Sequence, residues 1–332
     1  MAERILVTGG AGYIGSAVVS QLLARGYEPV VFDDLSHGHR AALPAGVPLV
    51  VGNVGDRVAL DRAFAEARPQ AVMHFAAFIE AGESMRVPEK YFRNNTASVL
   101  TLLEAVLAHQ VSRFVFSSTA ALYGTPEKTP IEESAPLRPT NAYGESKLLV
   151  EQMLEWLNRI HGLRYASLRY FNVAGAAGEQ GEDHQPESHL IPIALEVALG
   201  KRKEFAIFGD DYPTPDGTCI RDYIHVSDLG KAHLLVLEAL KEKDRLIYNL
   251  GNGKGFSVRE VIETVRRVTG HPIPARVSPR RPGDPAVLVA SSEKIKQELS
   301  WQPGYGDLES IVQSAWEWRK AHPDGYRTFE HN

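Results

Sequence analysis

A tyrosine and a lysine four residues apart carry the chemistry that this sequence most clearly suggests. Tyr143 and Lys147 lie in a segment that is expected to begin a helix, and this spacing places both side chains on one helical face. A nearby ammonium group favours the phenolate, so the pair predicts that the pKa of Tyr143 falls from about 10 toward the working pH. A phenolate base of this kind can remove a proton from an alcohol. Tyr-x-x-x-Lys also arises by chance, so its meaning depends on the surrounding elements.

Three glycines lie between the first predicted strand and the first predicted helix. The apolar run 5–7 is followed by Gly9, Gly12 and Gly15, and a helical pattern of apolar residues then covers 16–25. Glycine lets a backbone approach a pyrophosphate, and the N-terminus of a helix offers N–H donors and a positive dipole. The turn therefore predicts a dinucleotide site.

An aspartate ends the next predicted strand, which covers 29–32. Asp33 follows Gly15 at about the distance expected for an acid that binds the adenosine ribose. Its charge would repel a 2′-phosphate, and no arginine follows it directly. The sequence therefore favours NAD over NADP as the cofactor.

Strands and helices alternate throughout the first half of the chain. The predicted strands are 5–7, 29–32, 71–75, 114–116 and 165–169, and the predicted helices are 16–25, 91–109 and 141–161. This alternation predicts an α/β fold of the Rossmann type, a doubly wound parallel sheet with helices on both faces. Such sheets bind ligands beyond the carboxyl ends of their strands, where Gly9, Asp33, Phe75, Thr119 and Asn172 fall.

The second half has a different pattern. A polar, glycine-rich stretch over 175–188 predicts a loop or a domain boundary. Further predicted strands cover 205–208, 221–226 and 247–251, and predicted helices cover 192–200, 227–240, 257–270 and 307–322. These elements predict a smaller mixed α/β domain.

Composition excludes several classes of protein. The 332 residues are 44% apolar and 23% charged, as in ordinary globular proteins, and the net charge of −5 argues against nucleic acid as a partner. No apolar run approaches the roughly 20 residues that span a bilayer, and we expect no secretory segment before the first strand. The single cysteine, Cys219, fits a reducing cytoplasm. The histidines are scattered and no paired-cysteine or His-Glu-x-x-His motif occurs, so we expect no metal site.

With these motifs in place, the chain resembles the extended short-chain dehydrogenase/reductase family, and within it the UDP-glucose 4-epimerases. The resemblance extends over essentially the whole chain. The segments that carry it are 7–16 (VTGGAGYIGS), 74–77 (HFAA), 82–84 (GES), 116–120 (FSSTA), 143–147 (YGESK), 168–172 (LRYFN), 207–214 (IFGDDYPT) and 216–226 (DGTCIRDYIHV). The last two are far more specific than the glycine turn.

This resemblance implies a reaction with tightly held NAD. Tyr143 would remove a proton from the C4 hydroxyl of a UDP-hexose while hydride passes to the nicotinamide, and both would return on the opposite face of a 4-keto sugar. Thr119 would hydrogen-bond the reacting oxygen, and Lys147 would lower the pKa of the phenol and bind the nicotinamide ribose.

The same positional match implies the binding residues. The NAD site would contain Gly9, Gly12, Tyr13, Ile14, Gly15, Asp33, Asp34, Leu35, Asn53, Val54, Phe75, Ala76, Ala77, Asn94, Tyr143, Lys147 and Phe171. The UDP-sugar site would contain Thr119, Tyr143, Asn172, His189, Leu190, Ala206, Phe208, Arg221, Arg281 and Asp284. Two arginines converging on a diphosphate make electrostatic sense.

The resemblance also implies a domain division and a homodimer. Residues 1–173 would bind NAD, completed by segments near 221–251, and 174–332 would form the main part of a discontinuous UDP-sugar domain. The dimer would form through the helices near 92–108 and 143–160.

Three residues depart from the pattern of the resemblance, and they leave the exact substrate open. Ile79 stands where a lysine can contact the cofactor, His189 where an asparagine often contacts the substrate, and Leu288 where residue size is said to decide whether N-acetylated sugars fit. A 4,6-dehydratase would need an acid pair after Thr119, which alanines occupy here. An epimerase of uronate, pentose or N-acetylated sugars also fits the motifs. A non-catalytic NAD-sensing protein fits less well, because such sensors typically lose the tyrosine–lysine pair.

Overall fold

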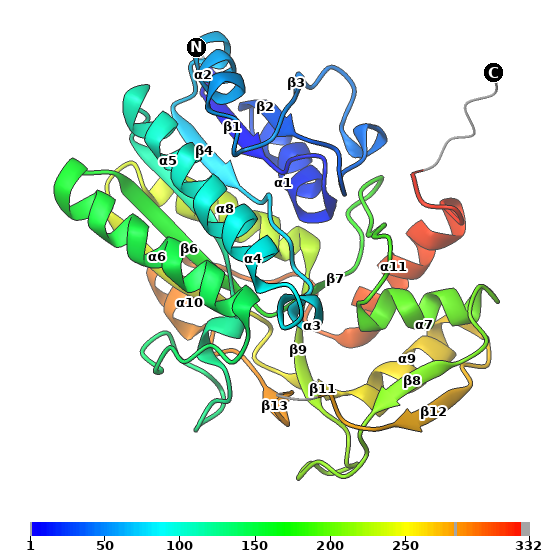
Figure 1. Ribbon diagram of the computed structural model, residues 1–332. Coiled ribbons are helices and arrows are strands. Elements are labelled where there is room, and N and C mark those ends of the chain that lie inside the picture. The colour runs from blue at the N-terminus through cyan, green and yellow to red at the C-terminus, as the bar shows by residue number, and fades with distance from the viewer. Residues whose placement is uncertain (1, 282–283, 327–332) are drawn as a thin grey trace.

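A parallel sheet of seven strands forms the frame of the protein (Figure 1). The computed structural model describes residues 2–281 and 284–326. The strands lie in the order β10-β6-β5-β4-β1-β2-β3, and all neighbours are parallel. Their bounds are β1 Arg4–Thr8, β2 Glu28–Asp33, β3 Leu49–Val51, β4 Ala71–His74, β5 Arg113–Thr119, β6 Arg164–Tyr170 and β10 Arg245–Leu250. The chain order reverses at β1, and ligands of such sheets bind at this switch point.

Helices cover both faces of the sheet, and each face has its own apolar core. In β1, Ile5 and Val7 belong to one core and Leu6 to the other, as the alternation of side chains along a strand requires. The helices of the first face are α1 Tyr13–Ala24, α8 Val226–Ala239 and α10 Glu293–Leu299, and those of the second are α2 Arg57–Ala67, α5 Ser98–Ala108 and α6 Ala142–His161. Two short helices, α3 Ala81–Ser84 and α4 Pro88–Tyr91, precede α5.

The smaller part of the protein lies beyond the carboxyl ends of these strands (Figure 1). One small sheet contains β7 Asn172–Ala174, β9 Ile220–His225, β11 Gly255–Ser257 and β13 Val287–Leu288, and a second pairs β8 Phe205–Phe208 with β12 Ala275–Ser278. The helices α7 Leu190–Ala198, α9 Val258–Thr269 and α11 Leu308–Ala321 pack around a third core. A capping box between Ser257 and Glu260 begins α9.

The predicted Rossmann-type α/β fold is confirmed, and the structure adds elements that the sequence analysis missed. Strand β10 joins the large sheet although elements of the smaller part precede and follow it in the chain, whereas β9 joins a small sheet. The missed elements include β3, α2, β12 and α10. Among the described residues, no helix combines the length and apolarity needed to cross a membrane.

The predicted helix over 91–109 is present, and it has a local change of geometry. A π-helical turn, Phe92–Ala97, lies between α4 and α5. The buried Asn95 explains the change, because its side chain accepts a hydrogen bond from the N–H of Phe78 and donates to the carbonyl of Phe78 and to Ser146 Oγ. A π turn often marks a functional site.

Candidate active site

A cavity of about 370 Å³ lies at the carboxyl ends of β1, β2, β4 and β5. Leu35 is the only residue of the predicted NAD set that does not line it. It adopts a positive φ of 59°, and its N–H donates to Asp33 Oδ1. The predicted NAD residues that line the cavity are Gly9, Gly12, Tyr13, Ile14, Gly15, Asp33, Asp34, Asn53, Val54, Phe75, Ala76, Ala77, Asn94, Tyr143, Lys147 and Phe171.

The glycine turn is shaped for close approach of a ligand to the backbone. A Cβ atom on Gly9 would lie 2.4 Å from the backbone nitrogen of Ala76, and one on Gly15 would lie 2.2 Å from the carbonyl oxygen of Gly9. Gly12 is the N-cap of α1 and offers no side chain to its first N–H groups. The free N–H groups lie at the N-terminus of α1, which borders the cavity, and a helix N-terminus favours an anion. The turn therefore fits the pyrophosphate of a dinucleotide.

Asp33 is fixed at the end of β2. Its Oδ2 accepts a hydrogen bond from the N–H of Ala11 at 2.9 Å, and its Oδ1 accepts one from Leu35 at 2.9 Å. Burial raises the pKa of Asp33 above its usual value, and the two backbone N–H groups oppose that rise. Each carboxylate oxygen keeps a free lone pair. The aspartate is therefore oriented to accept hydrogen bonds from ribose hydroxyls.

Three candidate catalytic residues meet at the other end of the cavity. Tyr143 and Lys147 lie in the first turns of α6, and Thr119 ends β5. Asn141 begins α6 by accepting a hydrogen bond from the N–H of Gly144, so the cap fixes where both α6 side chains project. The Tyr143 phenol hydrogen-bonds with Thr119. The Tyr143 phenol can donate or accept a proton, and the Thr119 hydroxyl lies beside it.

The predicted effect of Lys147 on Tyr143 is wrong for the protein alone. Burial raises the pKa of Tyr143 above its ordinary value, and the hydrogen bond with Thr119 offsets this only in part. Burial also lowers the pKa of Lys147 to about 7. The ammonium group donates to the carbonyl of Ser117 at 2.9 Å and lies 4.9 Å from the centre of the Phe116 ring. Desolvation therefore outweighs any help that the lysine gives to the phenolate.

A buried ion pair supports the strand ends beneath this site. Arg169 Nη2 lies 2.7 Å from Glu151 Oε2, and both side chains are at most 7% exposed. Ser118 Oγ donates to Glu151 Oε1 at 2.6 Å, and Arg169 also donates to the hydroxyl of Tyr123. The network joins α6 to β5 and β6, and it therefore holds Tyr143 and Thr119 in a common frame.

The predicted UDP-sugar residues divide into two groups. Thr119, Tyr143, Asn172 and His189 line the cavity, whereas the other six predicted residues do not. Of these six, Leu190 begins α7, Ala206 and Phe208 lie on β8, Arg221 lies on β9, and Arg281 and Asp284 belong to the loop before β13.

Four of the six residues outside the cavity contact one another in two pairs. Arg221 Nη2 lies 2.6 Å from Asp284 Oδ1, and the Arg281 guanidinium lies 4.1 Å from the centre of the Phe208 ring. Two residues that depart from the family pattern can also be located: Ile79 lines the cavity, and Leu288 packs in the small core that contains Phe171.

The structure brings further residues to the cavity that the sequence analysis missed. His37, Phe78, Tyr170, Glu182 and His184 all line it. Aromatic residues after strands and acids in a polar loop are common, so no local signal marked them.

The fold gathers four possible metal ligands that the sequence analysis did not foresee, two of them histidines expected to be scattered. Four side chains of one loop, Glu182, His184, Glu187 and His189, bring ligand atoms within 4.8 Å of one another. Their spacing matches no short motif, and only the folding of the loop gathers them.

Comparison with known proteins places this site in a family. The model of the NAD dependent epimerase/dehydratase family matches residues 5–251. A UDP-glucose 4-epimerase of Halalkalibacterium halodurans is 55% identical over 327 residues, which cover 98% of both chains. A crystal structure of a UDP-glucose 4-epimerase has a TM-score of 0.95 at 50% identity and covers 98% of this chain and 100% of its own. The Bifidobacterium longum enzyme, in complex with NAD+ and UDP, has a TM-score of 0.93 at 39% identity, covering 97% and 99%. The chain therefore belongs to the NAD dependent epimerase/dehydratase family, within its UDP-glucose 4-epimerase group.

Proposed function

We propose that this protein interconverts UDP-galactose and UDP-glucose by NAD-dependent epimerisation at C4. The observation that carries the proposal is the shared cavity: Tyr143, Thr119 and Lys147 line the same space as the glycine turn and Asp33. A proton-transfer group therefore lies where a nicotinamide ring would end if the adenosine ribose lay at Asp33.

The residues of the cavity fit NAD. The turn at Gly9 and Gly15 has no room for side chains, and α1 presents its uncapped N–H groups there. Asp33 would bind the adenosine ribose, and Lys147 the nicotinamide ribose. Bound NAD would supply the hydride acceptor and donor for the sugar C4 and a positive charge that favours the Tyr143 phenolate.

The chain's own residues would move one proton. Tyr143 takes the proton of the C4 hydroxyl as the C4–H bond breaks, and it returns that proton to the oxygen when the 4-keto sugar is reduced on its other face. Thr119 hydrogen-bonds the phenol and holds the reacting oxygen beside it. Protons and electrons balance within the site, so no external reductant is required.

A 4,6-dehydratase needs an acid pair after Thr119 to eliminate water, and this chain does not have that pair. Ala120 and Ala121 follow Thr119 in the 3₁₀ turn Ala120–Tyr123. Without an acid and a base at these positions the 4-keto sugar is left to be reduced again. The absence of these acids favours an epimerase over a dehydratase.

The nucleotide end of the substrate is assigned to the smaller domain. Arg221 and Arg281 would bind the diphosphate, and Asp284 would accept hydrogen bonds from the uridine ribose. Arg221 is already oriented by its ion pair with Asp284. The proposed division is therefore a cofactor domain over 1–173, completed by the segments near 221–251, and a discontinuous UDP-sugar domain.

The test is turnover without added cofactor. Purified protein incubated with UDP-galactose alone should form UDP-glucose, followed by proton NMR of the anomeric signals. Release of a 4-keto-6-deoxy sugar, or no turnover even with NAD added, would overturn the proposal. A panel of UDP-GlcNAc, UDP-glucuronate and UDP-xylose then defines which substituents Leu288 admits.

We also infer a homodimer that acts in a reducing cytoplasm. The two helices named for the dimer carry large exposed apolar side chains: Leu100 on α5 is 44% exposed, and Trp156 and Ile160 on α6 are 61% and 67% exposed. The buried lone thiol of Cys219 suits a reducing compartment. Light scattering should give the mass of two chains, and Trp156→Glu with Ile160→Glu should give that of one.

A further inference from the structure

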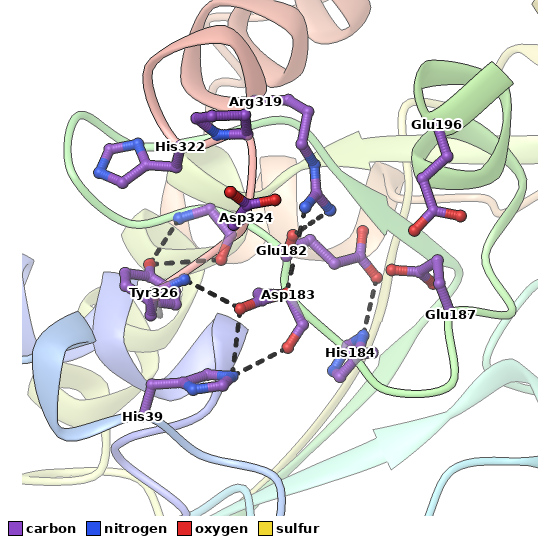
Figure 2. Close-up of polar contacts among 12 residues, drawn as sticks. His39, Glu182, Asp183, His184, Glu187, Glu196, Arg319, His322, Asp324 and Tyr326 are labelled. Carbon is purple, nitrogen blue, oxygen red and sulfur yellow. Dashed lines mark hydrogen bonds and ion pairs between the residues drawn. The ribbon is translucent and has the colours of Figure 1, made fainter. Parts of the chain in front are cut away.

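One loop of the cavity wall, beside Tyr13 of the glycine turn, contains a compact cluster of possible metal ligands. Glu182, His184, Glu187 and His189 come from eight consecutive positions, and their ligand atoms all lie within 4.8 Å of one another. Figure 2 shows the carboxylates of Glu182 and Glu187 turned toward each other, with the His184 ring beside them. No step of the proposed reaction uses this arrangement.

The donor atoms converge on one region rather than forming separate pairs. Glu182 Oε1 lies 3.1 Å from His184 Nδ1 and 2.7 Å from His189 Nδ1. The same nitrogen of His189 lies 3.2 Å from Glu187 Oε1. Two ring nitrogens therefore share one carboxylate oxygen, and two carboxylates share one ring nitrogen.

A second, independent feature points to a cation. The Glu187 side chain is 1% exposed, and its buried Oε2 has no hydrogen-bond partner among residues 2–281 and 284–326. Its Oε1 already accepts the N–H groups of Ser188 and His189 at 2.8 Å. A buried carboxylate oxygen without a partner is costly, and a metal ion would satisfy it.

The backbone of the loop is held in place by groups outside the cluster. Arg319 donates to the carbonyl of Glu182 at 2.9 Å, and Ser188 donates to Glu80 at 2.7 Å. Asp183, which points away from the cluster in Figure 2, pairs with His39 at 3.5 Å and accepts the N–H of Tyr326. The ligating side chains are therefore presented by a fixed backbone, which favours a bound ion over an adaptable surface.

We propose that these four residues bind one late first-row divalent cation, of which Zn²⁺ fits best. Two imidazoles and two carboxylates form the N₂O₂ set that suits this ion, and four protein ligands make a closed, structural site. Tetrahedral Zn²⁺ with bonds of about 2.0–2.1 Å holds its ligand atoms about 3.3 Å apart. The separations between the ligand atoms, from 2.7 Å to within 4.8 Å, bracket that spacing. The ion would fix the loop that carries His184 and His189 into the cavity wall.

The test uses the full-length protein without a histidine tag. After chelation and dialysis, the protein should take up about one Zn²⁺ per chain, measured by elemental analysis, with a rise in Tm. Co²⁺ in place of Zn²⁺ should give the strong visible absorption of a tetrahedral site. In the variant Glu187→Gln the affinity for Zn²⁺ should fall by a larger factor than the roughly 10- to 100-fold that is typical when a residue outside the ligand set is changed. His322→Gln, a nearby histidine outside the cluster, should bind as the unmodified chain does.

Three results would overturn the proposal. These are failure of the unmodified chain to retain Zn²⁺ or gain Tm, a weak octahedral Co²⁺ spectrum, and unchanged affinity in Glu187→Gln. Should Glu187→Gln fail to fold, His184→Gln and the Co²⁺ spectrum of the unmodified chain decide the matter. Metal content, Tm and absorption are measured without substrate, so failure here is distinguishable from failure of the proposed reaction.

Discussion

The two halves of the molecule hold their predicted site residues in different ways. In the sheet domain, strand ends and a helix cap bring the glycine turn, Asp33, Thr119 and Tyr143 to one cavity, above the buried Arg169–Glu151 pair. In the smaller domain, the predicted nucleotide contacts lie outside that cavity. Backbone pairing therefore positions the chemical groups, while the nucleotide contacts depend on side-chain pairs between a strand and a loop.

The largest effect should come from the hydroxyl of Tyr143. Tyr143→Phe removes the proton-transfer group and keeps the ring, so kcat should fall by about 10²–10⁴-fold while the affinity for UDP-sugar stays unchanged. Coupled assay and calorimetry measure the two quantities. Tyr248→Phe is the matched control, because its hydroxyl donates to Glu298 away from the cavity. Equal kcat in both variants would contradict a catalytic role for Tyr143.

The pKa of Tyr143 sharpens this prediction. Burial raises the pKa of the phenol in the protein alone, whereas the positive charge of NAD should lower it. Ultraviolet difference titration of the unmodified chain against Tyr143→Phe, with and without NAD, measures the shift. An unchanged phenol pKa on NAD binding would argue against this tuning.

The buried pair beneath the catalytic residues should dominate stability. Glu151→Ala leaves the Arg169 guanidinium buried without its partner, so the free energy of unfolding should fall by about 3–5 kcal/mol. Glu293→Ala breaks an exposed pair with Lys296 and should cost at most about 1 kcal/mol. Urea denaturation compares the two. A similar cost for both would show that the network is not a support for the site.

In the smaller domain, loss of charge should affect binding more than folding. Arg221→Gln removes one charged hydrogen bond to the proposed diphosphate, worth about 1.5–3 kcal/mol, or about 10- to 150-fold in Kd for UDP-glucose. Calorimetric titration and urea denaturation measure binding and stability separately. Arg276→Gln, whose exposed side chain pairs with Glu204, is the control and should bind normally. Lower stability with normal binding would reassign Arg221 to a structural role.

A further effect is a gradual slope in stability with pH. His74 is 1% exposed, and burial lowers its pKa to about 3. The unfolded chain takes up this proton near pH 6.5, so the stability due to neutral His74 is present above that pH and lost as pH falls toward 3. The slope is at most about 1.4 kcal/mol per pH unit.

Burial raises the pKa of Asp222 to about 6, and this carboxyl opposes the trend because the folded state binds its proton first. His74→Gln should therefore flatten the fall in unfolding free energy between pH 6.5 and 4.5.

Sequence reasoning succeeded where the determinants were local. The glycine turn, the acid at the end of the second strand and the N-cap before Tyr143 each act within about 30 residues. The three glycines, Asp33 and Tyr143 line the cavity. It failed on the π turn, because Asn95 is satisfied by Phe78 and Ser146, which only the fold brings near. It also failed on the pKa of Tyr143, because desolvation depends on everything packed around the phenol.

The sequence by itself determined the alternation of strands and helices in the first half of the chain, the dinucleotide turn and the identity of the groups that could exchange a proton. Hydrophobic periodicity, glycine and caps act over short distances, so they can be recognised along the chain. Only the tertiary structure decided which groups share a cavity, which charges are buried, and that two glutamates and two histidines of a polar loop converge. Convergence of side chains depends on long-range packing, which no local pattern encodes.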